Sequence, residues 1–432
     1  MMSALCRPLS LPDEHFIQLH GAQRGVALLW EQELGRWPKL RPGDPRIPGV
    51  LATQVGETDR FLTVNEFDGW RLVRLLRSLR ACFVDIDPPV GERVDLGLVL
   101  DALTSSRIPH PSFVVHSGRG IHLYWPIEAA PASCLPIWQR VQDEIIKALR
   151  PVGADPAARD CTRVLRLIGS INSKNGVTVQ GLVLSGTVWS LDELAAEVLP
   201  EPAARPARPH TATVRDLAAA SARTGKRKVT GSIYARWRHV YADLCRIGAY
   251  YAKRGGVPVG HRDTWLFLTA VSLSWFASGD ALAAEVERHA RECAPTLPEA
   301  QVRKIAADAT DRAERAAAGE VVMWNGRPTD VRYRFKRETL WAWIGPLVPE
   351  TMIPAMRAII PEQTRADRES ERQAARDRAK EGRYKNSRRN GVMASNEERR
   401  DRARGLRTQG MSIRAIAAEL GVSKSTIADW LR

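Results

Sequence analysis

The sequence has 432 residues, 44% of them hydrophobic and 26% charged, which predicts two to four folded domains. Its formal net charge of +15 favours a polyanionic partner, with nucleic acid ahead of an anionic membrane. No apolar run approaches the ~18 residues that span a bilayer, the amino-terminal stretch has no secretion-signal core, and the six cysteines form no CxxC pair. We therefore expect a cytoplasmic protein that has reduced thiols, no zinc ribbon and no membrane partner.

Residues 1–198 have mixed helix and strand patterns, which predict a first domain of the α+β class. The apolar spacing in "DGWRLVRLLRSLR" (68–80) predicts a helix, followed directly by a short buried strand in "ACFVDID". The segments "FVVH" and "IHLYW", on either side of a glycine turn, predict a β-hairpin. Helical spacing follows over 136–150, then a strand pattern over 177–186 and a short helix over 190–198.

Beyond residue 198 the composition and the spacing of apolar residues change several times along the chain. Residues 199–229 are rich in proline, alanine and arginine, which predicts a linker. Residues 230–320 have helical patterns throughout and predict an all-α domain, whereas 321–360 form a connector without an assigned fold. Residues 361–395 contain little to bury, so we expect either a solvated helix or a flexible charged arm.

Residues 396–432 predict a helix-turn-helix. Ser412 and Ser423 can cap two short helices, and Gly421 can supply the turn between them. The residues expected to face a DNA major groove lie at the start of the second helix: Lys424, Ser425 and Thr426. The alternative interpretation is a helical hairpin that contacts another protein.

Two acidic residues in a buried strand are the first candidates for chemistry. "FVDID" places Asp85 and Asp87 two positions apart, so both carboxylates point to one face of the strand. A divalent cation bound by hard oxygen ligands, Mg²⁺ or Mn²⁺, would offset their charge. The alternative is a strand end at which Asp87 begins the turn before Pro88.

The hairpin turn carries a second group of candidates. Gly118 and Gly120 allow close approach of the backbone, and Ser117 and Arg119 offer donors that suit phosphate. His122 on the following strand is either an ordinary packed side chain or a hydrogen-bond donor to a polyphosphate.

The stretch "GADPAARDCTRVLRLIGSINSKNG" supplies a third group. Asp155 and Asp160 offer one more carboxylate, and polar and cationic residues follow them: Arg163, Arg166, Asn172 and Lys174. Acids followed by spaced cations suit a metal–triphosphate complex, whereas each residue taken alone could be a surface ion pair.

In this order, "FVDID", "SGRGIHLYW" and "RVLRLIGSINSKNG" resemble the three motifs of the archaeo-eukaryotic primase superfamily, in the primase-polymerase branch carried by plasmids, phages and integrated elements. The resemblance covers roughly residues 55–190 and implies a catalytic core with an RNA-recognition-like sheet. It implies that Asp85, Asp87 and a later acid bind two metal ions and that His122 contacts the phosphates of the incoming nucleotide. It also implies supporting contacts from Arg163, Arg166 and Lys174.

The resemblance favours Asp155 over Asp160 as the third metal ligand, because the family's acid usually sits well ahead of the arginine-rich strand. Two positions depart from the family pattern: Gly120 stands where serine is frequent, and Ile168 replaces a proline. Residues 258–316 are similar to the small helical domain that follows such cores, and the C-terminal helices resemble the DNA-binding domain of serine recombinases.

These resemblances imply a primase or primase-polymerase of a mobile or extrachromosomal element that joins NTPs or dNTPs on single-stranded template DNA. The helix-turn-helix would bind a duplex site such as an origin. A separate helicase is expected, because Ala220 stands where a P-loop ending at Lys226 needs its first glycine. The alternatives are a non-catalytic replication initiator, a DNA-binding regulator, a two-metal nuclease and a rolling-circle nickase, although "HLY" supplies only one of the nickase's two histidines.

Overall fold

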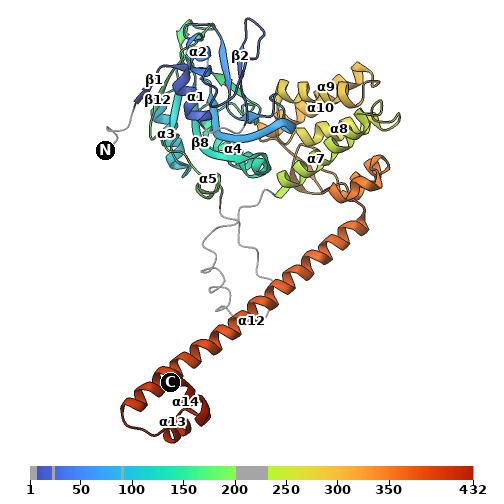
Figure 1. The fold of residues 1–432 in the computed structure, drawn as a ribbon. Coiled ribbons are helices and arrows are strands. Elements are labelled where there is room, and N and C mark those ends of the chain that lie inside the picture. Colours follow the sequence, from blue (N-terminus) through green and yellow to red (C-terminus); the bar gives the residue numbers. More distant parts are fainter. Residues whose placement is uncertain (1–6, 22–24, 89–91, 201–231, 432) are drawn as a thin grey trace. The chain divides into compact units, whose positions relative to one another are not determined.

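The computed structural model describes residues 7–21, 25–88, 92–200 and 232–431 (Figure 1). The predicted linker at 199–229 lies outside these residues apart from its first two positions, as do Ala220 and Lys226. The chain divides into two compact units, residues 1–359 and 360–432.

A six-stranded antiparallel sheet forms the centre of the first unit, in the order β1-β12-β7-β8-β6-β5. Its long central strands are β6 (Leu76–Ile86) and β8 (Ile121–Pro131). The shorter strands are β7 (Phe113–His116), β12 (Gln180–Val183), β1 (Arg7–Leu9) and β5 (Glu66–Phe67). Strands β7 and β8 form the predicted hairpin, and β8 continues beyond the predicted segment.

A second sheet of four strands has the order β3-β2-β4-β9. These strands are β3 (Lys39–Leu40), β2 (Ala27–Glu31), β4 (Arg60–Thr63) and β9 (Val164–Arg166). One face of this sheet is core, since Leu29, Leu62 and Leu165 are buried. A short ribbon of β10 (Ile171–Asn172) and β11 (Val177–Thr178) follows β9.

The helix predicted over 68–80 is wrong. A single 3-10 turn, η1 (Val73–Leu75), leads into β6, which begins at Leu76. Most of β6 is buried, and it pairs with β8 from Ser78 to Ile86. Long-range strand pairing therefore overrides the local helical spacing.

Helix α4 (Leu135–Leu149) covers the edge of β6 that β8 leaves open. The Gln142 side chain accepts the Phe83 N–H (3.0 Å) and donates to the Phe83 carbonyl (2.5 Å), and Trp138 Nε1 donates to the Ala81 carbonyl (2.9 Å). These side chains take the place of a neighbouring strand at Ala81 and Phe83, and so satisfy backbone groups of β6 just before Asp85. The other helices before residue 200 are α1 (Pro12–His20), α2 (Ile47–Ala52), α3 (Leu96–Ser105) and α5 (Leu191–Val198).

The predicted helical region forms a bundle that Figure 1 shows on one side of the sheets. It consists of α7 (Ser232–Ala252), α8 (Arg262–Leu273), α9 (Gly279–Cys293) and α10 (Glu299–Ala317). Glu285 of α9 accepts the backbone N–H of Val73 at 2.8 Å, directly before β6. After the bundle come the hairpin β13 (Val321–Trp324) and β14 (Arg327–Asp330), then α11 (Arg337–Ile344).

The second unit begins with a 47-residue helix, α12 (Glu362–Thr408), followed by α13 (Ile413–Leu420) and α14 (Lys424–Trp430). The segment expected to be a solvated helix or a flexible arm therefore has a helical backbone. Ser412 and Ser423 cap α13 and α14, and Gly421 is left-handed at φ 63°. A small core joins the three helices around Ala403, Ile416, Ala417, Ile427 and Trp430.

The predicted α+β class, with an all-helical region after the sheets and a helix-turn-helix at the end, is confirmed. Within the described residues, no helix is both long enough and apolar enough to cross a membrane.

Candidate functional site

A cavity of about 320 Å³ lies where the ends of β6, the β7–β8 turn and strand β9 meet. The predicted residues that line it are Asp85, Asp87, Ser117, Arg119, His122, Arg166, Asn172 and Lys174. The three sequence stretches chosen for chemistry therefore contribute side chains to one site.

Strand register explains why Asp85 meets His122. The two residues are directly opposed on β6 and β8, and such pairs project from the same face of a sheet. Asp85 Oδ1 lies 3.6 Å from His122 Nε2. Asp87 follows two residues later and also lines the cavity, as alternation along the strand predicts.

The Ile86 backbone and the Asp87 side chain leave no room for a side chain at Gly120. A β-carbon at this position would lie 2.6 Å from the Ile86 carbonyl oxygen and 2.7 Å from Asp87 Oδ1. This contact gives a physical reason for glycine where the family often has serine. Ser117 is buried, and its Oγ would lie 3.4 Å from the same β-carbon, so a serine hydroxyl still lines the cavity.

Burial raises the pKa of both aspartates. The pKa of Asp85 rises to about 6, mainly because its carboxylate is desolvated; Arg163 counteracts this shift, and the negative charge of Asp155 adds to it. The pKa of Asp87 is raised by burial and by the charge of Asp85. Two carboxylates held close together in this way favour a bound cation.

His122 is a neutral imidazole at physiological pH. Burial and, to a smaller extent, the positive charge of Arg166 lower its pKa to about 3. Its Nδ1 is buried without a hydrogen-bond partner, and its Nε2 is too far from Asp85 for a good hydrogen bond. The ring can therefore donate one N–H to an oxygen of a ligand in the cavity.

The structure separates the two candidates for the third acid. The Asp155 N–H donates to the Asp85 carbonyl at 2.8 Å, so residues 153–155 extend along the edge of β6 beside the acids. The Asp155 side chain is 37% exposed, whereas that of Asp160 is 3% exposed and accepts hydrogen bonds from Thr162 N (3.1 Å) and Oγ1 (2.5 Å). The geometry favours Asp155 for ligand binding and gives Asp160 a structural role in its loop.

Neither acid of this loop lines the cavity described above, and Arg163 lies between them. Its guanidinium is 3.6 Å from Asp155 Oδ2, and its Nε is 3.7 Å from Asp160 Oδ2. Arg163 therefore lies beside the acids of this loop and not on the part of the cavity lined by Arg166 and Lys174.

The opposite wall is built around Arg166. Its Nη1 donates to Asp59 Oδ1 (2.5 Å), and its guanidinium carbon lies 4.8 Å from the centre of the Phe61 ring. Asp59 also accepts the hydroxyl of Ser173 at 2.5 Å, which ties β9 to the turn that carries Lys174. Burial would raise the pKa of Asp59, but these hydrogen bonds together keep it below its usual value, so the pair with Arg166 stays charged.

Asn172 joins this wall to the β7–β8 turn. Its Nδ2 donates to the Ser117 carbonyl at 2.5 Å, and its Oδ1 accepts the Lys174 N–H at 3.1 Å. Asn172 therefore positions its neighbours, and its own amide is occupied.

Sequence reasoning missed Asp59 and Phe61. Phe61 lines the cavity, and Asp59 holds Arg166 in place. The segment "DRFLT" gave no local signal, because polar and apolar residues do not alternate in it and it does not reveal the partner strand.

The acids suit a divalent cation by type, since carboxylate oxygens are the ligands that Mg²⁺ and Mn²⁺ prefer. As positioned, however, no three or more His, Cys, Asp or Glu side chains among the described residues are arranged to hold a metal ion. Asp85 and Asp87, which line the cavity, and the neighbouring Asp155 have the ligand chemistry for one, but not the arrangement as positioned.

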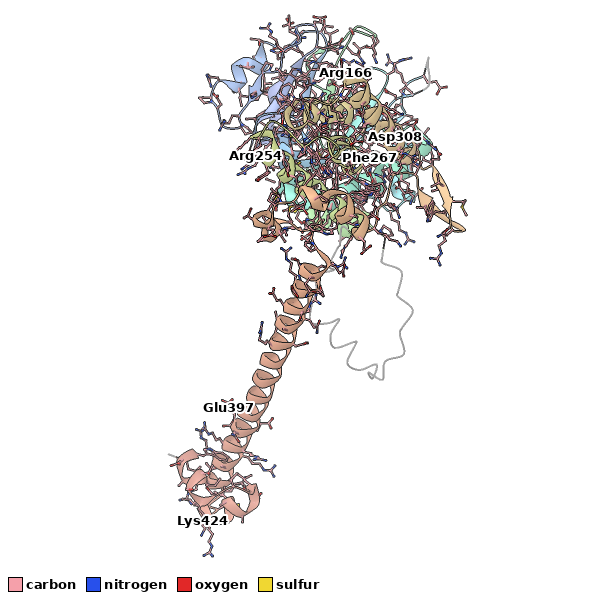
Figure 2. All side chains as sticks on the ribbon, turned by 90° about the vertical axis from the view of Figure 1, so that its right-hand side faces the viewer. Arg166, Arg254, Phe267, Asp308, Glu397 and Lys424 are labelled. Carbon is pink, nitrogen blue, oxygen red and sulfur yellow. The ribbon has the colours of Figure 1, made fainter. Side chains whose placement is uncertain are left out.

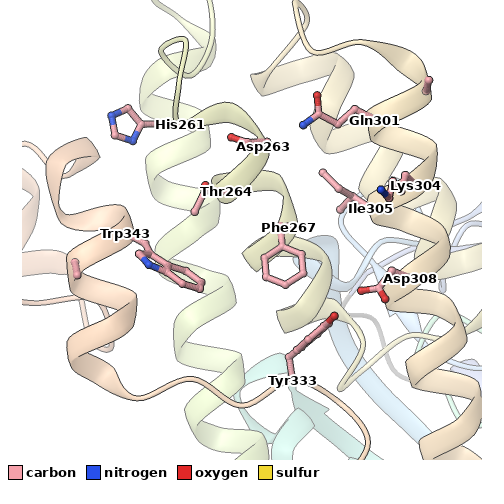
Figure 3. A pocket seen from close by; sticks show the side chains of 12 residues that line it. His261, Asp263, Thr264, Phe267, Gln301, Lys304, Ile305, Asp308, Tyr333 and Trp343 are labelled. Atoms are coloured by element: carbon pink, nitrogen blue, oxygen red, sulfur yellow. The ribbon is translucent and has the colours of Figure 1, made fainter.

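A larger cavity of about 1030 Å³ lies in the helical region (Figure 3). The residues that line it include Phe267 of α8, Trp343 of α11 and Tyr333, which precedes α11. Lys304 and Asp308 of α10 line it as well. It contains none of the residues predicted for catalysis.

The residues predicted to face DNA lie at the start of α14, where Figure 2 labels Lys424. Lys424 and Ser425 are exposed, whereas Thr426 is half-buried and its Oγ1 lies 2.7 Å from the capping Ser423 Oγ. The Ser425 Oγ also lies 2.8 Å from the Ser423 Oγ, so Lys424 is available for contact whereas both hydroxyls lie beside the cap.

Residues 395–432 match the model of a helix-turn-helix domain family. A stretch of 146 residues is 36% identical to a "Replication protein" of Clostridium perfringens and spans 33% of this chain. The match covers 36% of that protein's length, so the chain spans about a third of the relative.

Three solved structures are similar to parts of the chain. The archaeo-eukaryotic primase domain of the cyanophage S-2L primase-polymerase is 21% identical, with a TM-score of 0.33, over 44% of this chain and 97% of that one. Primase RepB′ is 16% identical, with a TM-score of 0.28, over 72% of this chain and 94% of that one. Its catalytic domain in complex with initiator DNA is 14% identical, with a TM-score of 0.29, over 49% and 97%.

Proposed function

We propose that the chain is a primase-polymerase that joins NTPs or dNTPs on a single-stranded DNA template to start or extend replication of a mobile element. One observation carries the proposal: a single cavity is lined by the acids Asp85 and Asp87 and by His122, Arg166 and Lys174. Acids close to cationic and hydrogen-bonding groups that can bind phosphate are what nucleotidyl transfer requires.

Each side of the cavity has a distinct task in this proposal. His122 donates its N–H to a phosphate oxygen, and Arg166 and Lys174 offset the negative charge that grows on the phosphates. Asp59 keeps the Arg166 guanidinium directed at the site. Ser117 and Arg119 offer further donors at the β7–β8 turn.

Asp85, Asp87 and Asp155 would hold Mg²⁺ or Mn²⁺. When bound, such ions lower the pKa of the attacking 3′-hydroxyl and stabilise the leaving pyrophosphate. The raised pKa of Asp85 supports this assignment, because a buried carboxylate of this kind is stabilised by a cation placed beside it.

The second unit would bind a duplex site through α14, and its contacts to phosphate make this step dependent on salt. The partial resemblance to a replication protein supports this setting. A separate helicase would supply unwinding.

The test is synthesis without a primer on circular single-stranded DNA, with NTPs and dNTPs supplied separately in Mg²⁺ and in Mn²⁺. The proposal predicts template-dependent products with at least one combination of nucleotide and metal ion, and the loss of these products in Asp85→Asn. Labelled template that is cut rather than copied would identify a two-metal nuclease instead.

A non-catalytic replication initiator is the second candidate, and the helix-turn-helix match at 395–432 favours it. It predicts tight binding of a duplex site with no nucleotide incorporation under any of these conditions.

A further inference from the structure

One face of the four-stranded sheet carries a row of residues that runs away from the cavity. Trp30 on β2 is opposed by Phe61 on β4, and Phe61 is opposed by Arg166 on β9. Directly opposed residues share a face, so all three side chains project from the same surface. The Phe61 ring lies 5.0 Å from Trp30, and the Arg166 guanidinium lies 4.8 Å from Phe61.

The row continues beyond the edge of β2. Trp37, from the loop between β2 and β3, stacks on Trp30 with ring centres 5.3 Å apart and an angle of 6° between the planes. Trp70 meets Trp37 edge-on at 5.3 Å, and the Arg71 guanidinium lies 4.8 Å from the Trp37 ring. We call these side chains the aromatic row: Phe61, Trp30, Trp37 and Trp70.

The aromatic row is not part of the core of this sheet. Its four members are all half-buried, whereas Leu29, Leu62 and Leu165 on the opposite face are 0–4% exposed. The packing that stabilises the sheet is therefore on the other side, and the row presents aromatic surface to solvent.

Two features identify what the row would bind. It is continuous with the candidate catalytic site, because Phe61 and Arg166 line that cavity as well. Two arginines also contact the row, Arg166 at Phe61 and Arg71 at Trp37, and the chain carries a formal net charge of +15. This combination complements a strand that has flat bases and a negative backbone.

The spacing favours a strand over a single nucleotide. From Arg166 to Trp70 the row consists of four successive contacts of 4.8–5.3 Å. This surface is longer than one base, so a single nucleotide would cover only part of it, whereas successive bases of a polynucleotide can lie along it.

We propose that the aromatic row is a stacking platform for the bases of single-stranded nucleic acid, which it guides into the cavity at Arg166. The inference deepens the proposed function, since the strand it would hold is the template. Stacking of a base on an aromatic side chain strengthens binding by roughly 5- to 150-fold per base.

The first experiment measures the affinity of the full chain for a labelled single strand of thymidines, with excess unlabelled duplex present to occupy the helix-turn-helix. We expect Trp37→Ala to weaken binding by roughly 5- to 150-fold. Trp324→Ala is the matched control, because this tryptophan is 70% exposed on the separate β13–β14 hairpin. Unchanged affinity in a folded Trp37→Ala variant would overturn the proposal.

A second measurement uses the unaltered chain, so it does not depend on the stability of a variant. Single strands that contain 5-iodouracil are cross-linked by light, and the attached residues are identified by mass spectrometry. The proposal requires cross-links to Trp30, Trp37 or Trp70; cross-links found only elsewhere would refute it.

These outcomes are separable from those of the proposed function. If the chain binds single strands through the row but incorporates no nucleotide, the proposed function fails and the platform stands. If the chain synthesises DNA while Trp37→Ala binds and copies the template normally, the platform fails and the proposed function stands.

Discussion

The buried histidine of the helical bundle should make the stability of the first unit depend on pH. His289 Nε2 lies 2.9 Å from the Tyr241 hydroxyl, which donates to Glu285 at 2.5 Å. Glu285 in turn accepts the N–H groups of Val73 and Arg74, so this chain of hydrogen bonds attaches the bundle to the start of β6. Burial lowers the pKa of His289 from 6.5 to about 3, so the ring stays neutral in the folded protein.

The sign and size of the effect follow from this shift. The folded pKa is depressed, so the unfolded state binds the proton more tightly below pH 6.5, and stability falls as the pH falls from 6.5 toward 3. Between pH 7 and pH 5 the loss from this one residue is about 2 kcal/mol. A His289→Gln variant removes the titrating group while retaining a side-chain N–H donor for Tyr241.

The assay is urea unfolding of the parent and of His289→Gln at pH 7 and pH 5, followed by tryptophan fluorescence. We expect the parent to lose about 2 kcal/mol more than the variant over this interval. His110→Gln is the control, because His110 is exposed and its Nε2 bonds only to the Thr104 side chain nearby in sequence. Equal pH dependence in the parent and in His289→Gln would refute the reasoning.

Three further predictions concern the candidate site and the helix-turn-helix. Gly120→Ala should cost about 1–3 kcal/mol in chemical unfolding and reduce synthesis, because the added carbon meets the Ile86 carbonyl and Asp87. Asp160→Ala should lower the free energy of unfolding by about 1–3 kcal/mol, because it leaves the Thr162 N–H without its hydrogen-bond acceptor. Asp155→Ala should abolish synthesis with a smaller loss of stability in the same unfolding assay. The reverse pattern would exchange the roles of the two acids. Lys424→Ala should weaken duplex binding and reduce the slope of log affinity against log salt by about one, measured by fluorescence anisotropy, without changing unprimed synthesis.

The residues that meet in the cavity were largely predictable because each lies in a short local pattern. "FVDID" alternates along one strand, and "SGRGIH" combines a turn with the strand that follows it. The sequence could not predict which residues face each other across strands. The pairing of Asp85 with His122 is a matter of register, and register is set by long-range contacts.

The wrong helix prediction and the overlooked site residues also result from long-range strand pairing. Residues 68–80 have helical spacing, yet β6 is buried between β8 and α4, and its partners on these two elements lie at least 35 residues further along the chain. Asp59 and Phe61 were overlooked because their importance arises only when β4 pairs with β9. Trp70 is likewise far in sequence from Trp30 and Trp37, and folding alone brings the three into one row.

The most direct test of the central claim compares nucleotide incorporation by the parent chain, the double variant Asp85→Asn with Asp87→Asn, and the control Asp101→Asn, whose carboxylate is exposed on α3. The template is circular single-stranded DNA without primer, and single-strand binding is measured on the same samples. We expect template-dependent products from the parent and the control, and none from the double variant, which should still bind the strand. Equal incorporation by the double variant would contradict a catalytic role for Asp85 and Asp87.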